Sequence, residues 1–289
     1  MYQKILCPAK INLFLEVLGK REDGYHELDT VMHSVNLCDT VGVEVNENGS
    51  GANRIELTCT DADLPTDSRN IAYRAAEAFA GKYGINGFDI KIDIEKRIPV
   101  AAGLAGGSTD CAGVLLMLES LFGTSDREGL LELGKSLGAD VPFCMTCGCA
   151  KASGVGDILT RVEPITPEWT LVIAKGERSV STKDAYAEID RLEDRGIRTS
   201  APLISRLEKG DVYSLSYHMF NRFEEIYEKS IPEVSTAKKL MIEGGALASM
   251  MSGSGPSVFG IFADYDEADN VRRALAGEGY SAFLCLPLM

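Results

Sequence analysis

The residues of this chain best suited to chemistry form a run of small side chains at residues 99–109, PVAAGLAGGST. Its glycines and alanines leave backbone N–H groups open to an anion, and a helix that starts there adds partial positive charge. The hydroxyls of Ser108 and Thr109 suit contact with a phosphate or with its metal ion. The run predicts a phosphate-binding loop; the alternative is a flexible turn with a Ser or Thr cap.

The neighbouring elements must position this loop. Residues 88–94 are apolar at every second position, which predicts a half-buried strand. Residues 110–122 are rich in Leu, Ala and Met, which predicts a buried helix. The order is therefore strand, loop, helix, and it brings the N-terminal end of the helix to the anion.

Two other phosphate-binding motifs fit the chain less well. The dinucleotide pattern G-x-G-x-x-G does not fit, because Gly103, Gly106 and Gly107 have the wrong spacing. A P-loop pattern is matched at residues 129–136, GLLELGKS. No strand-like run precedes it, the leucines have helical spacing, and Asp126 and Gly138 are a good cap and stop. These residues predict a helix, with a P-loop as the minor alternative.

The composition narrows the class of protein. A chain of 289 residues can form one large or two modest domains, and 45% apolar and 25% charged residues are ordinary for a globular protein. The formal net charge of −14 disfavours nucleic acid as a partner, although backbone dipoles can still hold a small anion. No apolar run is long enough to span a membrane and no secretion signal is evident, so we expect a cytoplasmic protein without membrane contact.

Eight cysteines in such a chain predict thiols rather than disulfides. Cys144, Cys147 and Cys149 have a spacing that resembles part of a zinc site. A fourth ligand is missing nearby, and the apolar context predicts a core strand in which cysteine acts as a small hydrophobic residue. We therefore expect no metal site there.

The chain as a whole predicts an α+β fold. The first 60 residues have strand patterns, a helix is expected over residues 70–82, and residues 141–160 predict short strands broken by glycines. Beyond residue 164 the pattern changes to strand 169–174, helix 182–192, helices within 213–243, strands within 246–262, helix 266–276 and a last strand. Without steady β-α-β alternation, two domains are predicted, at residues 1–160 and 161–289.

Four segments, in order along the chain, resemble the motifs of the GHMP small-molecule kinases. They are CPAKIN at residues 7–12, the loop at 99–109, LGADVP at 137–142 and SGSGPS at 252–257. The resemblance covers nearly the whole chain. It implies a two-domain GHMP kinase fold, with a C-terminal ferredoxin-like domain, an active site in the interdomain cleft, and ATP-dependent phosphorylation of an alcohol with Mg²⁺. The residues that it implies as contacts of ATP are Pro99, Val100, Ala101, Ala102, Gly103, Leu104, Ala105, Gly106, Gly107, Ser108 and Thr109.

The resemblance also implies a catalytic pair, Lys10 and Asp140. An aspartate can accept the proton of the attacking hydroxyl, and a lysine beside it would keep the carboxylate ionised and orient the hydroxyl. Without the resemblance, Asp140 is more simply a helix cap or a structural partner of Lys10, and Lys10 a solvated strand residue.

Residues 21–27, REDGYHE, and the doubled Gly106-Gly107 resemble those GHMP kinases whose small-molecule substrate is diphosphocytidyl methylerythritol. In this comparison Tyr25 and His26 match the aromatic and histidine that recognise cytidine, and Asn12 matches a polar residue near the sugar. Thr182, at a helix start, is a further candidate substrate contact. We expect a monomer or a weak homodimer.

Two rival functions stay open at this point. Another GHMP kinase, acting on homoserine, mevalonate or a sugar, would have no need of a cytosine reader at residues 24–26. A nucleotide-binding or RNA-binding protein could reuse the fold without catalysis, because fold alone never proves activity. The net charge and the pair of Lys10 and Asp140 disfavour the latter.

Overall fold

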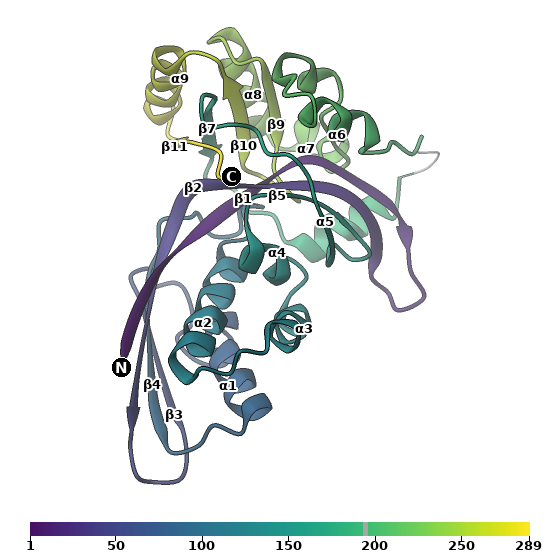
Figure 1. Ribbon diagram of the computed structural model, residues 1–289. Coiled ribbons are helices and arrows are strands. Elements are labelled where there is room, and N and C mark those ends of the chain that lie inside the picture. The colour runs from purple at the N-terminus through teal and green to yellow at the C-terminus, as the bar shows by residue number, and fades with distance from the viewer. Residues whose placement is uncertain (193–195) are drawn as a thin grey trace. The chain divides into compact units, whose positions relative to one another are not determined.

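The computed structural model describes residues 1–192 and 196–289, and it is an α+β fold as the sequence predicts (Figure 1). The strands are β1 (Tyr2–Lys20), β2 (His26–Glu47), β3 (Arg54–Cys59), β4 (Phe88–Glu95), β5 (Cys149–Ser153), β6 (Ile158–Arg161), β7 (Thr170–Lys175), β8 (Phe220–Asn221), β9 (Ala248–Met251), β10 (Val258–Phe262) and β11 (Ser281–Cys285). The helices are α1 (Ile71–Tyr83), α2 (Gly106–Phe122), α3 (Arg127–Leu137), α4 (Val141–Thr146), α5 (Thr182–Ile189), α6 (Ala201–Leu207), α7 (Glu224–Ser230), α8 (Pro232–Glu243) and α9 (Tyr265–Gly277), with a 3-10 helix, η1 (Val212–Tyr217).

The chain folds into two compact units that alternate along the sequence. The first consists of Met1–Ala9, Leu37–Ile98 and Ala105–Thr146, and the second of Lys10–Asn36, Pro99–Leu104 and Cys147–Met289. Strands β1 and β2 contribute residues to both units. The domain boundary near residue 160 stays a prediction.

In the first unit, helices α1, α2 and α3 cover one side of a sheet that contains β3 and β4 (Figure 1). Strand β4 pairs antiparallel with the last third of β2 and parallel with β3. The predicted alternation in β4 is confirmed, since Ile90, Ile92 and Ile94 are buried. These isoleucines pack against α1 and α2 in a single apolar core.

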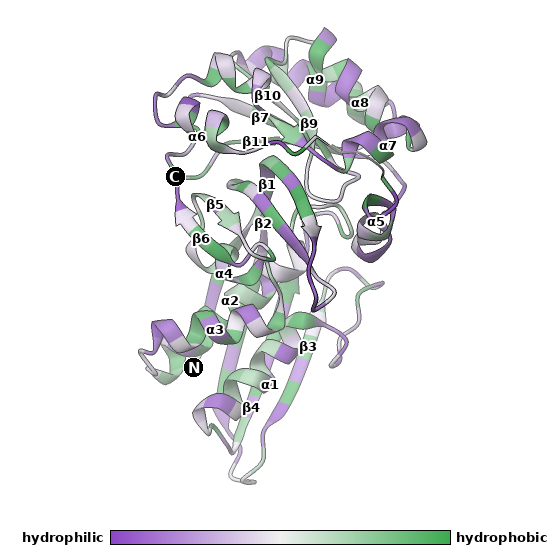
Figure 2. Cartoon of the chain, turned by 90° about the vertical axis from the view of Figure 1, so that its right-hand side faces the viewer, coloured by the Kyte–Doolittle hydropathy of each residue, from purple (hydrophilic) through white to green (hydrophobic). Residues whose placement is uncertain are grey.

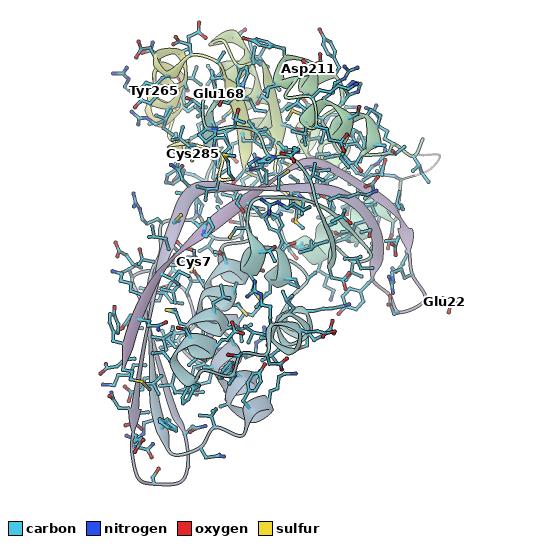
Figure 3. The ribbon with its side chains drawn as sticks, in the orientation of Figure 1. Cys7, Glu22, Glu168, Asp211, Tyr265 and Cys285 are labelled. Carbon is cyan, nitrogen blue, oxygen red and sulfur yellow. The ribbon has the colours of Figure 1, made fainter. Side chains whose placement is uncertain are left out.

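Helix α2 lies closely against β1 within the same unit. Its Gly113 faces Cys7, the cysteine labelled on β1 in Figure 3, and a Cβ atom at Gly113 would collide with the Cys7 sulfur. Residues 109–115 of α2 are all buried, so the predicted buried helix is confirmed.

The second unit contains a four-stranded antiparallel sheet in the order β11-β7-β10-β9. Helices α8 and α9 pack against it. Helix α9 is amphipathic, with hydrophobic and hydrophilic residues along its length in Figure 2, and its Ala268, Val271 and Leu275 are buried. The same unit contains β5 and β6, and β8 pairs parallel with β1.

The structure corrects the expectation of short strands across residues 141–160. Val141–Thr146 forms helix α4, and strands begin only at β5 and β6. A short apolar run does not distinguish a strand from a buried helical turn, and Pro142 suits a first helical turn because it has no N–H to leave unsatisfied. Cys144 therefore lies on a helix and Cys149 on β5.

Residues 129–136 lie inside helix α3, which Asp126 caps by accepting the amide of Gly129. The helix prediction is confirmed, and the P-loop alternative is wrong because a regular helix cannot wrap a phosphate. No disulfide bond, and no group of three His, Cys, Asp or Glu side chains suited to a metal ion, occurs within residues 1–192 and 196–289. Within these same ranges no helix has the length and apolarity to cross a bilayer.

His33 on β2 is a buried, neutral imidazole that joins this strand to the segment around Ile165 in the second unit. Its Nε2 accepts the amide of Ile165 at 2.8 Å, and its Nδ1–H donates to the Ser34 carbonyl at 2.9 Å. Burial lowers the pKa of His33 from 6.5 to about 4, and the two hydrogen bonds only partly oppose this shift. As the pH falls below 6.5 the unfolded chain takes up a proton before the folded chain does, so stability is lost.

We predict that His33 alone makes the protein about 2 kcal/mol less stable at pH 5 than at pH 7.5. Urea unfolding at the two pH values measures this loss. In His33→Gln the difference between the two pH values should shrink by a similar amount. If the difference in unfolding free energy between pH 5 and pH 7.5 were the same in His33→Gln as in the wild type, His33 would not be the cause of the pH dependence.

Candidate active site

The glycine-rich run adopts a backbone that side chains rarely permit. Ala101, Gly103 and Ala105 all have positive φ, at 49°, 76° and 58°. Two of them are alanines, for which the left-handed region is uncommon and costs energy. Helix α2 starts directly afterwards at Gly106, earlier than the predicted residue 110. Its N-cap is Ala105 without a side-chain cap, so the alternative of a turn capped by Ser or Thr is wrong.

The second unit holds the middle of this loop against the turn at residues 252–257. The Ser252 hydroxyl donates to the Gly103 carbonyl at 3.0 Å, and the Ser257 amide donates to the Ala102 carbonyl at 3.3 Å. A Cβ atom at Gly103 would collide with the Ser252 carbonyl oxygen, and one at Gly253 would lie 2.8 Å from the Gly103 carbonyl oxygen. The two glycines are needed because two backbones touch here.

That turn is itself held by polar side chains. The Asn221 amide donates to the carbonyls of Met251 and Gly253, at 2.7 and 2.9 Å. Thr182, the first residue of α5, lies with its hydroxyl 3.2 Å from that of Ser254. The candidate substrate residue Thr182 is thus joined to the turn that supports the loop.

Lys10 and Asn12 lie next to the loop on β1. The Lys10 amide donates to the Leu104 carbonyl at 3.1 Å, and its ammonium donates to Asn12 Oδ1 at 2.7 Å. Asn12 Nδ2 in turn donates to the Thr30 hydroxyl at 2.8 Å, which donates to the Phe14 carbonyl at 2.6 Å. Lys10, Asn12 and Thr30 are all buried, so this chain of hydrogen bonds fixes the lysine in one orientation.

His26 is held by a second set of contacts in the same unit. Its Nε2 lies 2.7 Å from Asp190 Oδ1, and Lys20 donates to the other oxygen of Asp190 at 2.8 Å. These two partners keep the pKa of Asp190 below its usual value. The His26 ring stacks on Tyr186 with 4.6 Å between ring centroids, whereas Tyr25 is exposed.

Asp140 precedes helix α4, and its carbonyl accepts the Cys144 amide at 3.0 Å. It belongs to the first unit and Lys10 to the second. Their action as a pair stays a prediction.

Four residues that support the site are not predicted from the sequence: Thr30, Tyr186, Asp190 and Asn221. Each is a partner of another side chain or of a backbone group elsewhere in the chain. None belongs to a short motif, whereas Ser254, the partner of Thr182, lies within the SGSGPS motif at residues 252–257. The only local signal is the position of Asp190 at the end of a predicted helix that follows Thr182, and that pattern fits many surface residues.

Comparisons with known proteins show the family to which the chain belongs. The family model for the N-terminal domain of GHMP kinases matches residues 70–148, and the model for their C-terminal domain matches residues 203–281. A protein of Clostridium botulinum (strain Eklund 17B / Type B), named 4-diphosphocytidyl-2-C-methyl-D-erythritol kinase, is 44% identical over 277 residues, 96% of each chain. The chain belongs to the GHMP kinases, in the group of 4-diphosphocytidyl-2-C-methyl-D-erythritol kinases.

Further relatives support this placement. A protein of the same name from Alkaliphilus metalliredigens (strain QYMF) is 42% identical over 93% of this chain and 90% of its own. A crystal structure of 4-(cytidine 5'-diphospho)-2C-methyl-D-erythritol kinase superposes with a TM-score of 0.80 at 32% identity, covering 99% of both chains. Homoserine kinase from Cytophaga hutchinsonii has a TM-score of 0.76 at 19% identity, covering 100% of this chain and 95% of its own, and therefore shares the fold alone.

The contact between Gly103 and Ser252 can be tested by substitution. Gly103→Ala introduces both an unfavourable positive φ and a collision with backbone, so we expect it to cost about 2–4 kcal/mol of unfolding free energy and to weaken ATP binding. Urea unfolding and titration with a fluorescent ATP analogue measure the two effects.

Gly123→Ala is the matched control, because Gly123 has a similar φ of 64° with nothing within 4 Å of its added Cβ. It should cost only about 1–2 kcal/mol and leave ATP binding unchanged. Equal costs for the two variants would show that the collision does not matter.

Proposed function

We propose that this chain transfers the γ-phosphoryl group of ATP to the 2-hydroxyl of 4-diphosphocytidyl-2-C-methyl-D-erythritol, giving the 2-phosphate and ADP in isoprenoid precursor biosynthesis. The observation that carries the proposal is the 44% identity over 96% of both chains to a kinase named for this substrate. The side chains held around the glycine loop and His26 supply the groups that the reaction needs.

The loop and the start of α2 bind the phosphates of ATP. Phosphoryl transfer passes through a loose transition state, so the protein mainly positions the groups and stabilises charge on the transferred phosphoryl. The left-handed residues of the loop keep backbone N–H groups unshielded by side chains, and α2 adds its positive helix end. A chain with net charge −14 can hold an anion there because the attraction is local.

Mg²⁺ enters with ATP as part of the substrate. Oxygen ligands suit this ion, and the buried Thr109 hydroxyl has no hydrogen-bond partner among the described residues, which fits an added polar group at the start of α2. Ser108 and Thr109 are the residues that would approach it. The ion neutralises charge on the phosphates when it is bound.

Asp140 is the proposed base and Lys10 the proposed cation of the reaction. The bond from the 2-oxygen to the γ-phosphorus forms while the bond from that phosphorus to the β–γ bridging oxygen breaks, and the hydroxyl proton passes to the Asp140 carboxylate. A base of this kind contributes about 10²–10⁴-fold, or roughly 3–5 kcal/mol of barrier. Lys10 is suited to its part because Asn12 and Leu104 fix it beside the loop.

The cytidine end of the substrate is recognised by His26 and Tyr25. When the ionised Asp190 accepts the proton on Nε2, a neutral His26 presents Nδ1 as an acceptor, which suits the exocyclic amine of cytosine. The exposed ring of Tyr25 offers a stacking face for the base. Asn12 and Thr182 are the proposed contacts of the polyol.

The assay for this proposal is release of ADP with the diphosphocytidyl substrate, with homoserine and mevalonate run in parallel. We predict turnover with the first substrate only. Lys10→Ala and Asp140→Asn should fold and bind nucleotide, yet turn over at least about 10²-fold more slowly, because each loses a positioned catalytic group.

Lys135→Ala is the control, because it also removes a lysine but at a position on helix α3, within the P-loop pattern that the structure rules out. It should retain nearly full activity. Turnover of homoserine in preference to the diphosphocytidyl substrate, or full activity in Asp140→Asn, would refute the proposal.

A further inference from the structure

A buried cluster of three charges lies at the two ends of the glycine loop, within the first unit. Lys96, just after β4, donates its ammonium to Asp39 of β2 and to Asp110 of α2, the latter at 2.9 Å. The side chains of Lys96, Asp39 and Asp110 are 6%, 0% and 5% exposed. The reaction described above does not use any of them.

Asp39 fixes the start of the loop. Its second oxygen accepts the backbone amides of Arg97 at 2.6 Å and of Ile98 at 2.8 Å. One carboxylate therefore binds both of these residues. Ile98 is the last residue before the loop begins at Pro99. A carboxylate that accepts three hydrogen bonds holds its donors in nearly fixed positions.

Lys96 also fixes the end of the loop. A Cβ atom at Gly106, the first residue of α2, would lie 3.2 Å from the Lys96 ammonium nitrogen and 3.2 Å from Ile98 Cγ2. The helix start therefore rests directly on the lysine and on the residue that Asp39 holds. Asp110, one turn further along α2, binds the same ammonium. One cation thus connects both ends of the loop.

Stability alone does not account for such a cluster. Burying an ion pair costs desolvation that the pairing rarely exceeds, so an apolar core would serve stability equally well. Burial lowers the pKa of Lys96, but the neighbouring Asp110 and Asp39 outweigh it and the net shift is upward, so the lysine stays charged. Its two carboxylate partners offset that positive charge, so the cluster acts on the loop by holding its two ends in place rather than by attracting phosphate.

We propose that Lys96, held by Asp39 and Asp110, is a positioning residue for the nucleotide, which sets the separation of the loop ends and strengthens phosphate binding at the start of α2. This inference rests on the proposed function in so far as the loop binds ATP. Lys96 itself is buried and acts through the backbone of the loop and the helix.

The test uses Asp110→Asn, which replaces the Asp110 carboxyl group with a neutral amide and keeps a hydrogen-bond acceptor for Lys96. Only one oxygen of Asp110 has a partner among the described residues, so the loss is confined to the bond to Lys96. We expect the KM for ATP and the dissociation constant of a fluorescent ATP analogue to rise about 5–30-fold, from loosened loop ends. The KM for the diphosphocytidyl substrate should change less than about twofold. Lys96→Met should raise the KM for ATP and the dissociation constant of the analogue further than Asp110→Asn does.

Glu16→Gln is the matched control. Glu16 forms an equally buried pair with Arg222 in the second unit, with two hydrogen bonds at 2.7 and 2.5 Å and side chains 1% and 3% exposed. This variant should lower the urea midpoint as Asp110→Asn does, yet leave ATP affinity unchanged.

Two outcomes would overturn the inference. One is an ATP affinity in Asp110→Asn within about twofold of wild type at a lowered urea midpoint, which would make the cluster merely structural. The other is an equal loss of ATP affinity in Glu16→Gln. Because binding of the ATP analogue is measured without the alcohol, failure of the wild type to phosphorylate the diphosphocytidyl substrate would refute the proposed function and leave this test intact.

Discussion

The structure depends on one constraint: a loop that binds an anion through its backbone N–H groups must have small side chains, and small side chains cannot anchor the loop in the core. The loop between β4 and α2 is made mostly of small residues, three of them at positive φ, and only Ala102 and Leu104 in its middle are buried. Neighbouring backbone holds it instead. The Ser252 turn touches Gly103, and the Lys10 amide donates to Leu104. Two motifs far apart in the sequence, at residues 7–12 and 252–257, both supply hydrogen bonds to the backbone of this loop.

Charge is distributed in keeping with that constraint. The chain has a net charge of −14, so long-range attraction cannot bring a polyphosphate to it. On the proposed function, the attraction to the phosphates is short-range and comes from oriented amides, a helix end, and a lysine held in a fixed orientation. Lys10 is fixed by Asn12, and Lys96 by Asp39 and Asp110. A buried, fixed ammonium loses less entropy on binding than a solvated one, and this partly offsets the cost of its burial.

The sequence predicted those parts of the fold and site that depend on local pattern. The alternation of β4, the buried face of α2 and the helical spacing of α3 were all readable, and so was the loop between them. The start of α2 was missed because Gly106 and Gly107 have low helix propensity, which tertiary contact with Lys96 and Ile98 overrides. Residues such as Asp190 could not be found, because their role lies in a partner more than 150 positions away, His26, and no periodicity records such a pairing.

The difference between contacts made by backbone and contacts made by side chains explains how one fold can serve different substrates. Homoserine kinase from Cytophaga hutchinsonii shares this fold at 19% identity, so the fold tolerates replacement of most side chains. A loop that binds phosphate through backbone survives such replacement, since its demands are small residues and supporting turns. The cluster around His26 is built from side chains: His26 begins strand β2, Tyr186 lies on α5, and Asp190 directly follows that helix. On the proposed function, recognition of the second substrate rests on these side chains. On the proposed function, specificity can therefore change at a few side chains while the phosphate loop and its buried supports stay as they are.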